Sequence, residues 1–252
     1  MREASYEQLK DYAPNVAVLP WGATESHGGH LPYAADVIEA EAFASRAARI
    51  AVERGGRPVV LPAVPFGNNA QQLDQVATCH LSSATAFHLL RDIVSSLIRQ
   101  DIDRVLIVNA HGGNNFQPHV RDLELEFGVL IVVANFYQMV PDVRAEIFDT
   151  PGDHADESEA SLLLYLCPDL VQMKRAGSGT RRPFDIGAVS QPGVWTPRPW
   201  TRIHPDTTSG DARAATSEKG ERYFEAVSNA IAEVMLGLSR AVPGDLPYLG
   251  ST

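Results

Sequence analysis

A short stretch near the N-terminus gathers side chains that commonly bind metal ions. Between Leu19 and Asp36 the chain carries Glu25, His27 and His30 among glycines and prolines. In an extended segment, residues two apart point the same way, so Glu25 and His27 can face one ion or two adjacent ions. Carboxylates and imidazoles together suit a divalent metal. The alternative is a polar surface loop in which Asp36 caps the following helix, and the spacing alone leaves both open. His30 is interpreted as a residue that supports the loop.

A second cluster begins at His111, directly after an apolar run, and continues as Gly112, Gly113, Asn114 and Asn115. The histidine can serve as a metal ligand or a base, and the glycine amides can approach a developing negative charge. The alternative is a tight strand-to-helix turn with Asn114 or Asn115 as the helix cap. A second histidine at the end of a strand favours a site, because both loops are expected at one edge of the sheet.

A third cluster contains Asp153, His154 and Glu159. His154 is a candidate general acid or base. Glu159 has a structural alternative, because Asp156 followed three residues later by Glu159 resembles a capping box, and the spacing alone favours the cap. The other histidines show no comparable setting and are expected to be structural: His80, His88, His119 and His204. No Gly-x-Ser-x-Gly elbow is present, which argues against a serine hydrolase.

The elements that must position these residues alternate between strand and helix. Apolar runs predict strands over 16–19, 58–62, 104–109 and 129–134. Helical spacing predicts helices over 37–54, after Ser82 or Ser83, from about 116, over 162–166 and over 216–240. This alternation predicts an α/β fold with a mostly parallel sheet covered on both faces, in one domain over 1–252. The loops after Leu19 and Asn109 then lie at the carboxyl ends of strands, where such sheets bind ligands.

A long segment over 177–213 is rich in Gly, Pro, Thr and Arg and contains Trp195 and Trp200. A loop of this length in a compact domain is usually functional or disordered. The two tryptophans favour a lid or an interface over disorder, and a lid of this kind suits a compact, flat substrate.

Composition excludes several classes of function. The chain has 252 residues, 44% of them hydrophobic, and a net charge of −10. No basic stripe suggests nucleic-acid binding, and no cationic amphipathic helix or apolar run of about 20 residues suggests a membrane. The two cysteines form no Cys-x-x-Cys pair and the N-terminus lacks the apolar core of a signal peptide, so we expect a cytoplasmic protein.

Together these segments resemble the creatininase family of metal-dependent amidohydrolases. Residues 19–36 match its opening pattern nearly throughout, and His111 to Asn114 match its second motif. Residues 154–161 are similar to its third motif, with Asp156 in place of Gly and Ala160 in place of Thr. Residues 209–213 and 215–220 resemble its C-terminal signature. The matches follow the family's order along nearly the whole chain.

The resemblance implies a three-layer α/β/α fold, a site for two divalent ions and often a homohexamer. It also implies the metal ligands, with Asp36 bridging: Glu25, His27, Asp36, His111 and Glu159. Creatininase itself has a Glu where this chain has Gly113, and members with the His-Gly-Gly-Asn motif use the Glu of the third motif instead. Glu159 thus moves from probable cap to ligand, and His154 corresponds to the proton-shuttling histidine. Zinc or manganese is expected first, with iron or cobalt as alternatives.

The expected reaction is hydrolysis of a small cyclic substrate, a ring amide or a ring ketone, by a metal-bridging hydroxide. The Gly112 and Gly113 amides would stabilise the oxyanion, Asn114 and Trp195 would contact the substrate, and His154 would deliver a proton, oriented by Asp153. The region 67–81 departs from the family pattern and favours substrates other than creatinine, as in the 3-dehydro-scyllo-inosose hydrolases. Creatinine hydrolysis, a peptidase-like activity and a non-catalytic metal-binding protein remain the alternatives.

Overall fold

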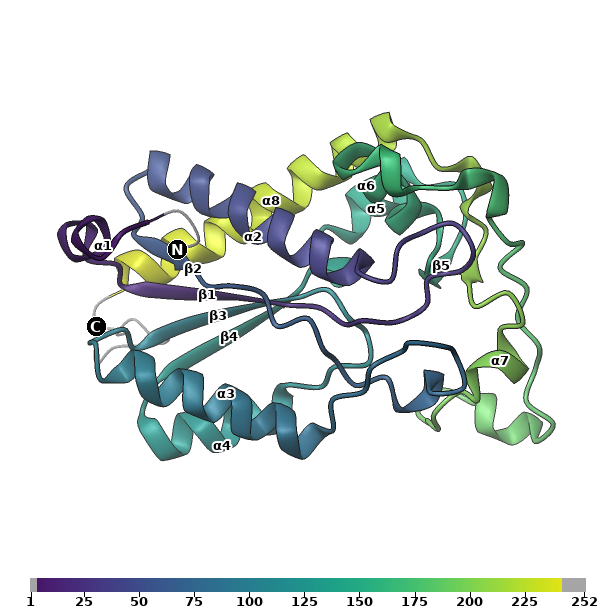
Figure 1. Cartoon of the computed structure of the whole chain (residues 1–252), viewed down its shortest axis with the longest axis horizontal. Coiled ribbons are helices and arrows are strands. Elements are labelled where there is room, and N and C mark those ends of the chain that lie inside the picture. Colours follow the sequence, from purple (N-terminus) through teal and green to yellow (C-terminus); the bar gives the residue numbers. More distant parts are fainter. Residues whose placement is uncertain (1–3, 242–252) are drawn as a thin grey trace.

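Four parallel strands form the central sheet of the computed structural model, which describes residues 4–241 (Figure 1). The strand order is β2-β1-β3-β4. The strands are β1 (Val16–Trp21), β2 (Pro58–Val60), β3 (Arg104–Asn109) and β4 (Leu130–Asn135). Every residue of β1 and β3 is buried, as expected for central strands that are covered on both faces. The predicted parallel α/β sheet is confirmed.

Helices cover both faces of the sheet and make three layers (Figure 1). One face carries α2 (Ala35–Glu53), α5 (Pro141–Ile147), α6 (Glu157–Leu166) and α8 (Ser217–Arg240). The other face carries α3 (Ser83–Ile98) and α4 (Gln117–Phe127), while α1 (Tyr6–Tyr12) lies near the amino end of β1. Because strand side chains alternate between faces, Val16 and Val18 belong to the first core, and Ala17, Leu19 and Trp21 belong to the second.

Local signals in the sequence account for several helix ends. Ser82 caps α3 by accepting a hydrogen bond from the Thr85 amide over 3.2 Å, as predicted. Pro118 lies in the first turn of α4, where its missing N–H is tolerated. Short 3-10 turns connect other elements: Ala70–Gln72, Phe136–Gln138, Pro168–Leu170, Met173–Arg175, Gly187–Ser190 and Ala212–Ala214. Helix α6 begins at Glu157, earlier than the predicted residue 162, so the third motif runs from the end of β5 into the first turns of this helix.

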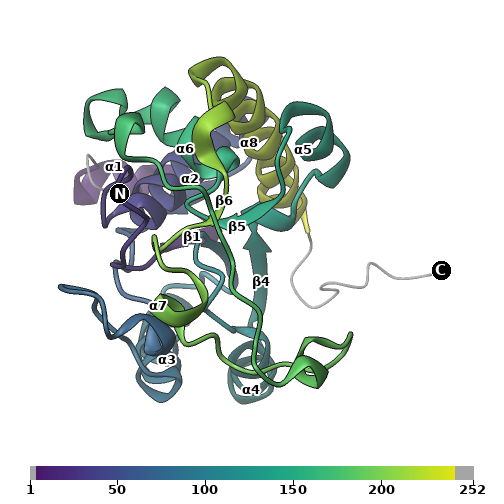
Figure 2. The same cartoon turned by 90° about the vertical axis from the view of Figure 1, so that its right-hand side faces the viewer.

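The segment 177–213 is less irregular than predicted. It contains the short helix α7 (Trp200–Ile203) and the strand β6 (Ser209–Gly210). Strand β6 pairs antiparallel with β5 (Gly152–His154), a strand that the sequence did not predict. Figure 2 shows the segment passing in front of the carboxyl ends of the central strands, with α7 below β5. The pairing therefore ties the segment to the third motif.

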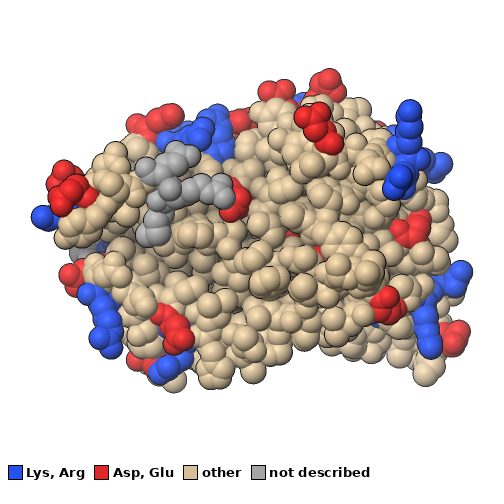
Figure 3. Space-filling model, viewed as in Figure 1, with Lys and Arg blue, Asp and Glu red and all other residues tan. Residues whose placement is uncertain are grey.

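Charged side chains of both signs lie around the rim of the face shown in Figure 3, and uncharged residues fill its centre. Among residues 4–241, no helix is both long enough and apolar enough to cross a bilayer. The single domain over 1–252 stays a prediction, and its ends at 1–3 and 242–252 lie outside the described residues.

Candidate metal-binding active site

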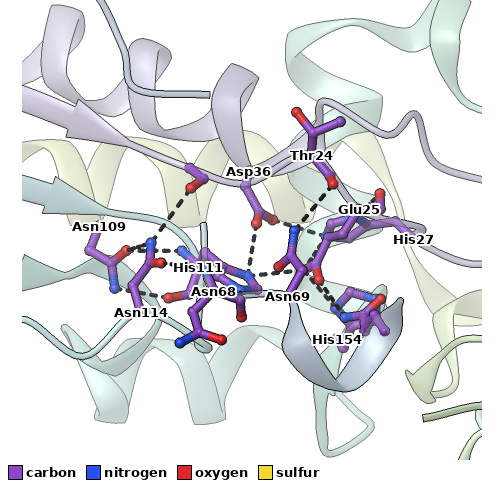
Figure 4. A network of polar contacts seen from close by, with 12 residues as sticks. Thr24, Glu25, His27, Asp36, Asn68, Asn69, Asn109, His111, Asn114 and His154 are labelled. Atoms are coloured by element: carbon purple, nitrogen blue, oxygen red, sulfur yellow. Dashed lines mark hydrogen bonds and ion pairs between the residues drawn. The ribbon is translucent and has the colours of Figure 1, made fainter. Parts of the chain in front are cut away.

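The loop after β1 and the first turn of α2 bring three of the predicted ligands together (Figure 4). Asp36 Oδ1 lies 2.9 Å from His27 Nε2, and Glu25 Oε1 lies 4.0 Å from the same nitrogen. Gly22 allows this approach, since a Cβ there would lie 2.8 Å from the Asp36 carbonyl carbon. The N-cap of α2 is Ala34, which makes no side-chain bond, so the alternative role of Asp36 as the cap is wrong.

His111 joins this group from the end of β3, because β3 pairs directly with β1 in the sheet. Its Nδ1 lies 2.9 Å from Glu25 Oε1 and 3.1 Å from Asp36 Oδ2. Its Nε2–H donates to the Asn68 carbonyl over 3.1 Å, which leaves Nδ1 free to act as a ligand. Gly113 makes room for that bond, because a Cβ there would lie 2.4 Å from both the Asn68 oxygen and His111 Nε2.

The residues after His111 divide into two roles. Gly112 and Gly113 line the cavity described below, and within residues 4–241 neither amide N–H has a hydrogen-bond acceptor. Asn114 does not line it: its Oδ1 accepts from the Asn68 amide over 3.0 Å and its Nδ2 donates to Asn109 Oδ1 over 3.0 Å. The amide of Asn114 thus holds the loop, so its predicted contact with a substrate stays a prediction, and the residue does not cap α4.

A strained turn places His154 and Glu159 against the same cluster. Ala155 has a φ of 48°, in the left-handed region that costs a non-glycine residue about 1–2 kcal/mol. Its amide donates to Glu159 Oε2, and the Asp156 carboxylate caps α6 by accepting from the amides of Ser158 and Glu159. The reciprocal capping box is thus wrong: Glu159 bonds the residue before the N-cap and keeps its carboxylate 4.0 Å from His27 Nε2.

His154 is held by the backbone and not by Asp153. Its Nε2–H donates to the Ser26 carbonyl over 2.8 Å, and its Nδ1 faces Glu25 Oε1 at 3.7 Å. Asp153 instead forms an ion pair with Arg198, with Nη1 3.0 Å from Oδ2. Neighbouring residues of a strand point to opposite sides, so β5 turns Asp153 away from His154. The predicted orientation of His154 by Asp153 is therefore wrong.

The segment 177–213 closes the site with Trp200. Trp200 is 1% exposed and packs against His154 on one side and His204 on the other, with ring centroids 4.9 and 4.5 Å away. Trp195 is 82% exposed and lines the outer part of a cavity of about 1590 Å³ that opens from the ligand cluster. Trp195 therefore lines this cavity, and its contact with a substrate stays a prediction, whereas Trp200 is the tryptophan that contacts the candidate catalytic histidine.

The buried charges of the cluster compensate one another. Burial alone would lower the pKa of His27, but the carboxylates of Asp36, Glu159 and Glu25 outweigh it and raise this pKa to about 10. Burial raises the pKa of Glu159 to about 8 against the opposing effect of His27. Burial and the nearby His27 lower the pKa of His154 to about 4, so His154 is neutral at neutral pH.

The donor set fits divalent metal ions. Two groups of three side chains, Glu25 with Asp36 and His111, and His27 with Asp36 and Glu159, hold their ligand atoms within 4.8 Å of one another. His27 Nε2 and Asp36 Oδ2 are buried and, within residues 4–241, make no hydrogen bond, although they lie close to other polar atoms. Atoms that converge without bonding one another are what a shared ion requires. A third group, Glu25 with His27 and His154, offers a further combination.

Known proteins resemble this chain in both sequence and architecture. The family model named Creatininase, described as creatinine amidohydrolase, matches residues 2–235. The chain belongs to the creatininase family. A creatinine amidohydrolase from Pseudomonas putida is 29% identical, with 90% of this chain and 93% of that protein covered. A mycofactocin precursor peptide peptidase from Mycolicibacterium smegmatis is also 29% identical, with 90% and 86% covered.

Solved structures and a more distant relative extend the comparison. A crystal structure from Bacteroides fragilis, ascribed to creatinine amidohydrolase, superposes with a TM-score of 0.90 at 36% identity and covers 96% of each chain. Manganese and zinc-zinc forms of creatininase share the fold at 24% identity, with TM-scores of 0.77. A 3-dehydro-scyllo-inosose hydrolase from Thermotoga maritima is 22% identical over 96% of this chain and 83% of that protein. The three-layer creatininase fold is thus confirmed.

The structure adds residues to this creatininase site that sequence reasoning missed. Gln72 donates its amide to Glu25 Oε2, and Arg198 stacks on Trp200 at 4.5 Å. Glu39, on α2, is fully buried without a hydrogen-bond partner among residues 4–241. Burial, then Glu159 and Asp36, raises the pKa of Glu39 well above its usual value, so it is a neutral acid behind the cluster. Of these, only Gln72 carried a signal in the sequence, because it ends a short loop, residues 65–72, that is rich in Asn and Gln.

Proposed function

We propose that this creatininase-family chain is a metal-dependent hydrolase with two neighbouring divalent ions. Glu25, Asp36 and His111 would hold one ion, and His27, Asp36 and Glu159 would hold the other. The observation that carries the proposal is the position of Asp36, which belongs to both groups and presents Oδ1 to His27 and Oδ2 to His111. This supports the expected bridging role of Asp36.

The ligand chemistry supports zinc or manganese first, with iron and cobalt as alternatives. Every candidate ligand atom is a nitrogen or an oxygen, and the two cysteines, Cys79 and Cys167, are outside the cluster. The existence of manganese and zinc-zinc forms of creatininase agrees with this preference. The homohexamer and the cytoplasmic location also stay proposals, based on the family resemblance and on composition.

The residues around the cluster can complete a hydrolytic reaction. Bound divalent ions would polarise a carbonyl group and lower the pKa of water toward neutrality. His154, which is neutral and has Nδ1 directed at the cluster, can accept a proton there and return it to a leaving group. The free N–H groups of Gly112 and Gly113 can donate to the oxyanion that forms at the attacked carbonyl. Trp200 covers His154 and limits the access of bulk water.

The substrate we propose first is a small ring amide or ring ketone, as the names of the creatinine and inosose hydrolases suggest. The second candidate is a short peptide, as for the mycofactocin precursor peptidase. The size of the cavity supports this second candidate, because its volume of about 1590 Å³ exceeds the roughly 300–1,000 Å³ usual for small-molecule sites. A compact ring would leave much of this space to water, whereas a peptide would extend toward Trp195.

Metal analysis of the purified protein, followed by a screen of cyclic amides, inososes and short peptides, tests the proposal. We expect about two ions per chain, as in two-metal sites, and loss of both ions and of activity in Asp36→Ala. Asp153→Asn is the matched control, because Asp153 is not in a ligand group, and should keep both ions. Full metal content in Asp36→Ala would refute the bridging role. Metal binding without turnover of any of these substrates would favour a non-catalytic binding protein.

A further inference from the structure

We propose that Gln72 is a positioning residue that makes Glu25 bind its ion through one oxygen only. The inference rests on the proposed metal site and concerns how one ligand of that site is held. Glu25 is 1% exposed and its two oxygens have different surroundings. Oε1 lies 2.9 Å from His111 Nδ1 and 3.7 Å from His154 Nδ1, inside the ligand cluster. Oε2 accepts a hydrogen bond from the Gln72 side-chain amide.

The contact is not needed to fold the loop that carries Gln72. Asn69 fixes this loop by donating to the Thr24 carbonyl over 3.2 Å and to the Cys79 carbonyl over 2.8 Å. The Tyr33 hydroxyl ties its far end by donating to the Val76 carbonyl over 2.6 Å. The side chain of Gln72 is therefore free for another use.

The other end of the Gln72 amide, its oxygen, is left without a hydrogen bond. It is 2% exposed, and its Oε1 has no hydrogen-bond partner within residues 4–241. Leaving a buried amide oxygen unpaired costs about 1–3 kcal/mol. A bond from an amide to a carboxylate is charge-assisted and about twice as strong as a neutral one, so it can offset this cost. We therefore interpret the Gln72 side chain as placed to bond Glu25, and not only to fill the space beside it.

The consequence concerns coordination. An oxygen that already accepts a strong hydrogen bond in a buried site is a poorer second ligand for the same ion. Without Gln72, the Glu25 carboxylate could turn and approach the ion with both oxygens. Loss of an outer-shell partner of this kind typically lowers metal affinity by about 10–100-fold.

Titration of the metal-free full chain with Co²⁺ tests the inference, because the visible spectrum of bound cobalt reports its coordination. Gln72→Met preserves the length of the side chain and removes the donor. We expect its cobalt affinity to fall by about 10–100-fold and its spectrum to differ from that of the parent protein. Gln75→Met is the matched control, because Gln75 lies in the same loop and its amide atoms make no hydrogen bond within the described chain. It should keep the parent affinity and spectrum.

A second variant and an unfolding measurement separate positioning from folding. Gln72→Asn keeps the amide but shortens the side chain by one methylene, so the donor no longer reaches Glu25 and the cobalt affinity and spectrum should resemble those of Gln72→Met. A purely structural role would not change the cobalt spectrum. In their metal-free form both variants should still unfold in a single cooperative transition, which separates a lost cobalt site from a lost fold. Parent-like affinity and spectrum in Gln72→Met would overturn the inference, whereas a parent protein that binds no cobalt would refute the metal site itself.

Discussion

The indole ring of Trp200 meets the imidazole of His154 edge to face, with centroids 4.9 Å apart and planes at 85°. The two residues come from α7 and β5, segments that are far apart in the sequence. Edge-to-face pairs of this kind contribute about 0.5–1.5 kcal/mol beyond the area that they bury. Trp200 thus anchors the segment 177–213 and also forms one wall of the site.

Replacing Trp200 should destabilise the protein far more than replacing Trp195. Trp200→Ala removes a fully buried ring and should lower the free energy of unfolding by about 3–5 kcal/mol. Trp195→Ala, the matched control, removes an exposed ring and should change it by less than about 0.5 kcal/mol. Chemical denaturation of the three proteins provides the measurement. Equal losses for the two variants would contradict the anchoring role of Trp200.

Glu159→Gln should remove one ion and leave the other. Glu159 belongs only to the group with His27 and Asp36, so the group of Glu25, Asp36 and His111 remains intact. Elemental analysis should show the metal content falling from about two ions per chain to about one. Glu157→Gln serves as the control, because Glu157 is two positions away on α6, bonds Lys219, and is in no ligand group. Retention of both ions by Glu159→Gln would remove Glu159 from the ligand set.

The buried carboxylate of Glu157 should make stability depend on pH. Burial opposes ionisation, but hydrogen bonds from Lys219 and Thr150 lower the pKa of Glu157 in the folded chain. The unfolded chain therefore takes up this proton at higher pH, so the stabilisation is complete above the unfolded pKa and is lost as pH falls through the folded one. Glu157→Gln should lower the free energy of unfolding by about 1–3 kcal/mol at neutral pH, because the buried charge-assisted bond from Lys219 is lost while Lys219 keeps its contact with Asp149.

The measurement for Glu157 is a pair of denaturation series from neutral to acidic pH. The difference in unfolding free energy between the parent and Glu157→Gln should shrink as the pH is lowered. A constant difference across the series would show that the ion pair with Lys219 is not the source of the stabilisation.

Arg198 should control how firmly the segment 177–213 is closed. It binds Asp153 through its side chain and Gln71 through its amide N–H, and it stacks on Trp200. Arg198→Met should increase the rate of proteolytic cleavage within 177–213 by about 1.4- to 5-fold, since the free energy of opening falls by about 0.2–1 kcal/mol, the range for exposed ion pairs. Arg202→Met, at an exposed position on α7, is the control. Unchanged cleavage in Arg198→Met would show that the ion pair does not hold the segment.

Regular apolar patterns made most of the sheet predictable. β1 and β3 are short apolar runs, and the loops that follow them bring candidate metal ligands to one edge of the sheet, as the switch-point rule predicts. The strand β5 was missed because Gly152 to His154 have no strand composition, and their pairing partner β6 lies much later in the chain. Pairing of that kind is set by tertiary structure and leaves no local pattern.

The roles of individual side chains were harder to predict than the convergence of the candidate ligands. Trp195 and Trp200 occupy the same irregular segment, and only the folded structure shows that one is exposed and the other buried. Asp153 next to His154 suggested an acid that orients a base, but the alternation of side chains along β5 sends the carboxylate to Arg198. Adjacency in sequence does not imply contact when the backbone is extended.

The tight fit at Gly113 has an evolutionary consequence. Any side chain there would collide with the Asn68 carbonyl and with the ring of His111, so the glutamate that the family resemblance led us to compare with this position cannot be introduced without moving the loop that contains Asn68. Glu159 stands in its place as the candidate ligand, from another part of the chain. A side chain at position 113 would therefore require a coupled change in the loop of Asn68, so a single substitution cannot exchange one source of the carboxylate for the other.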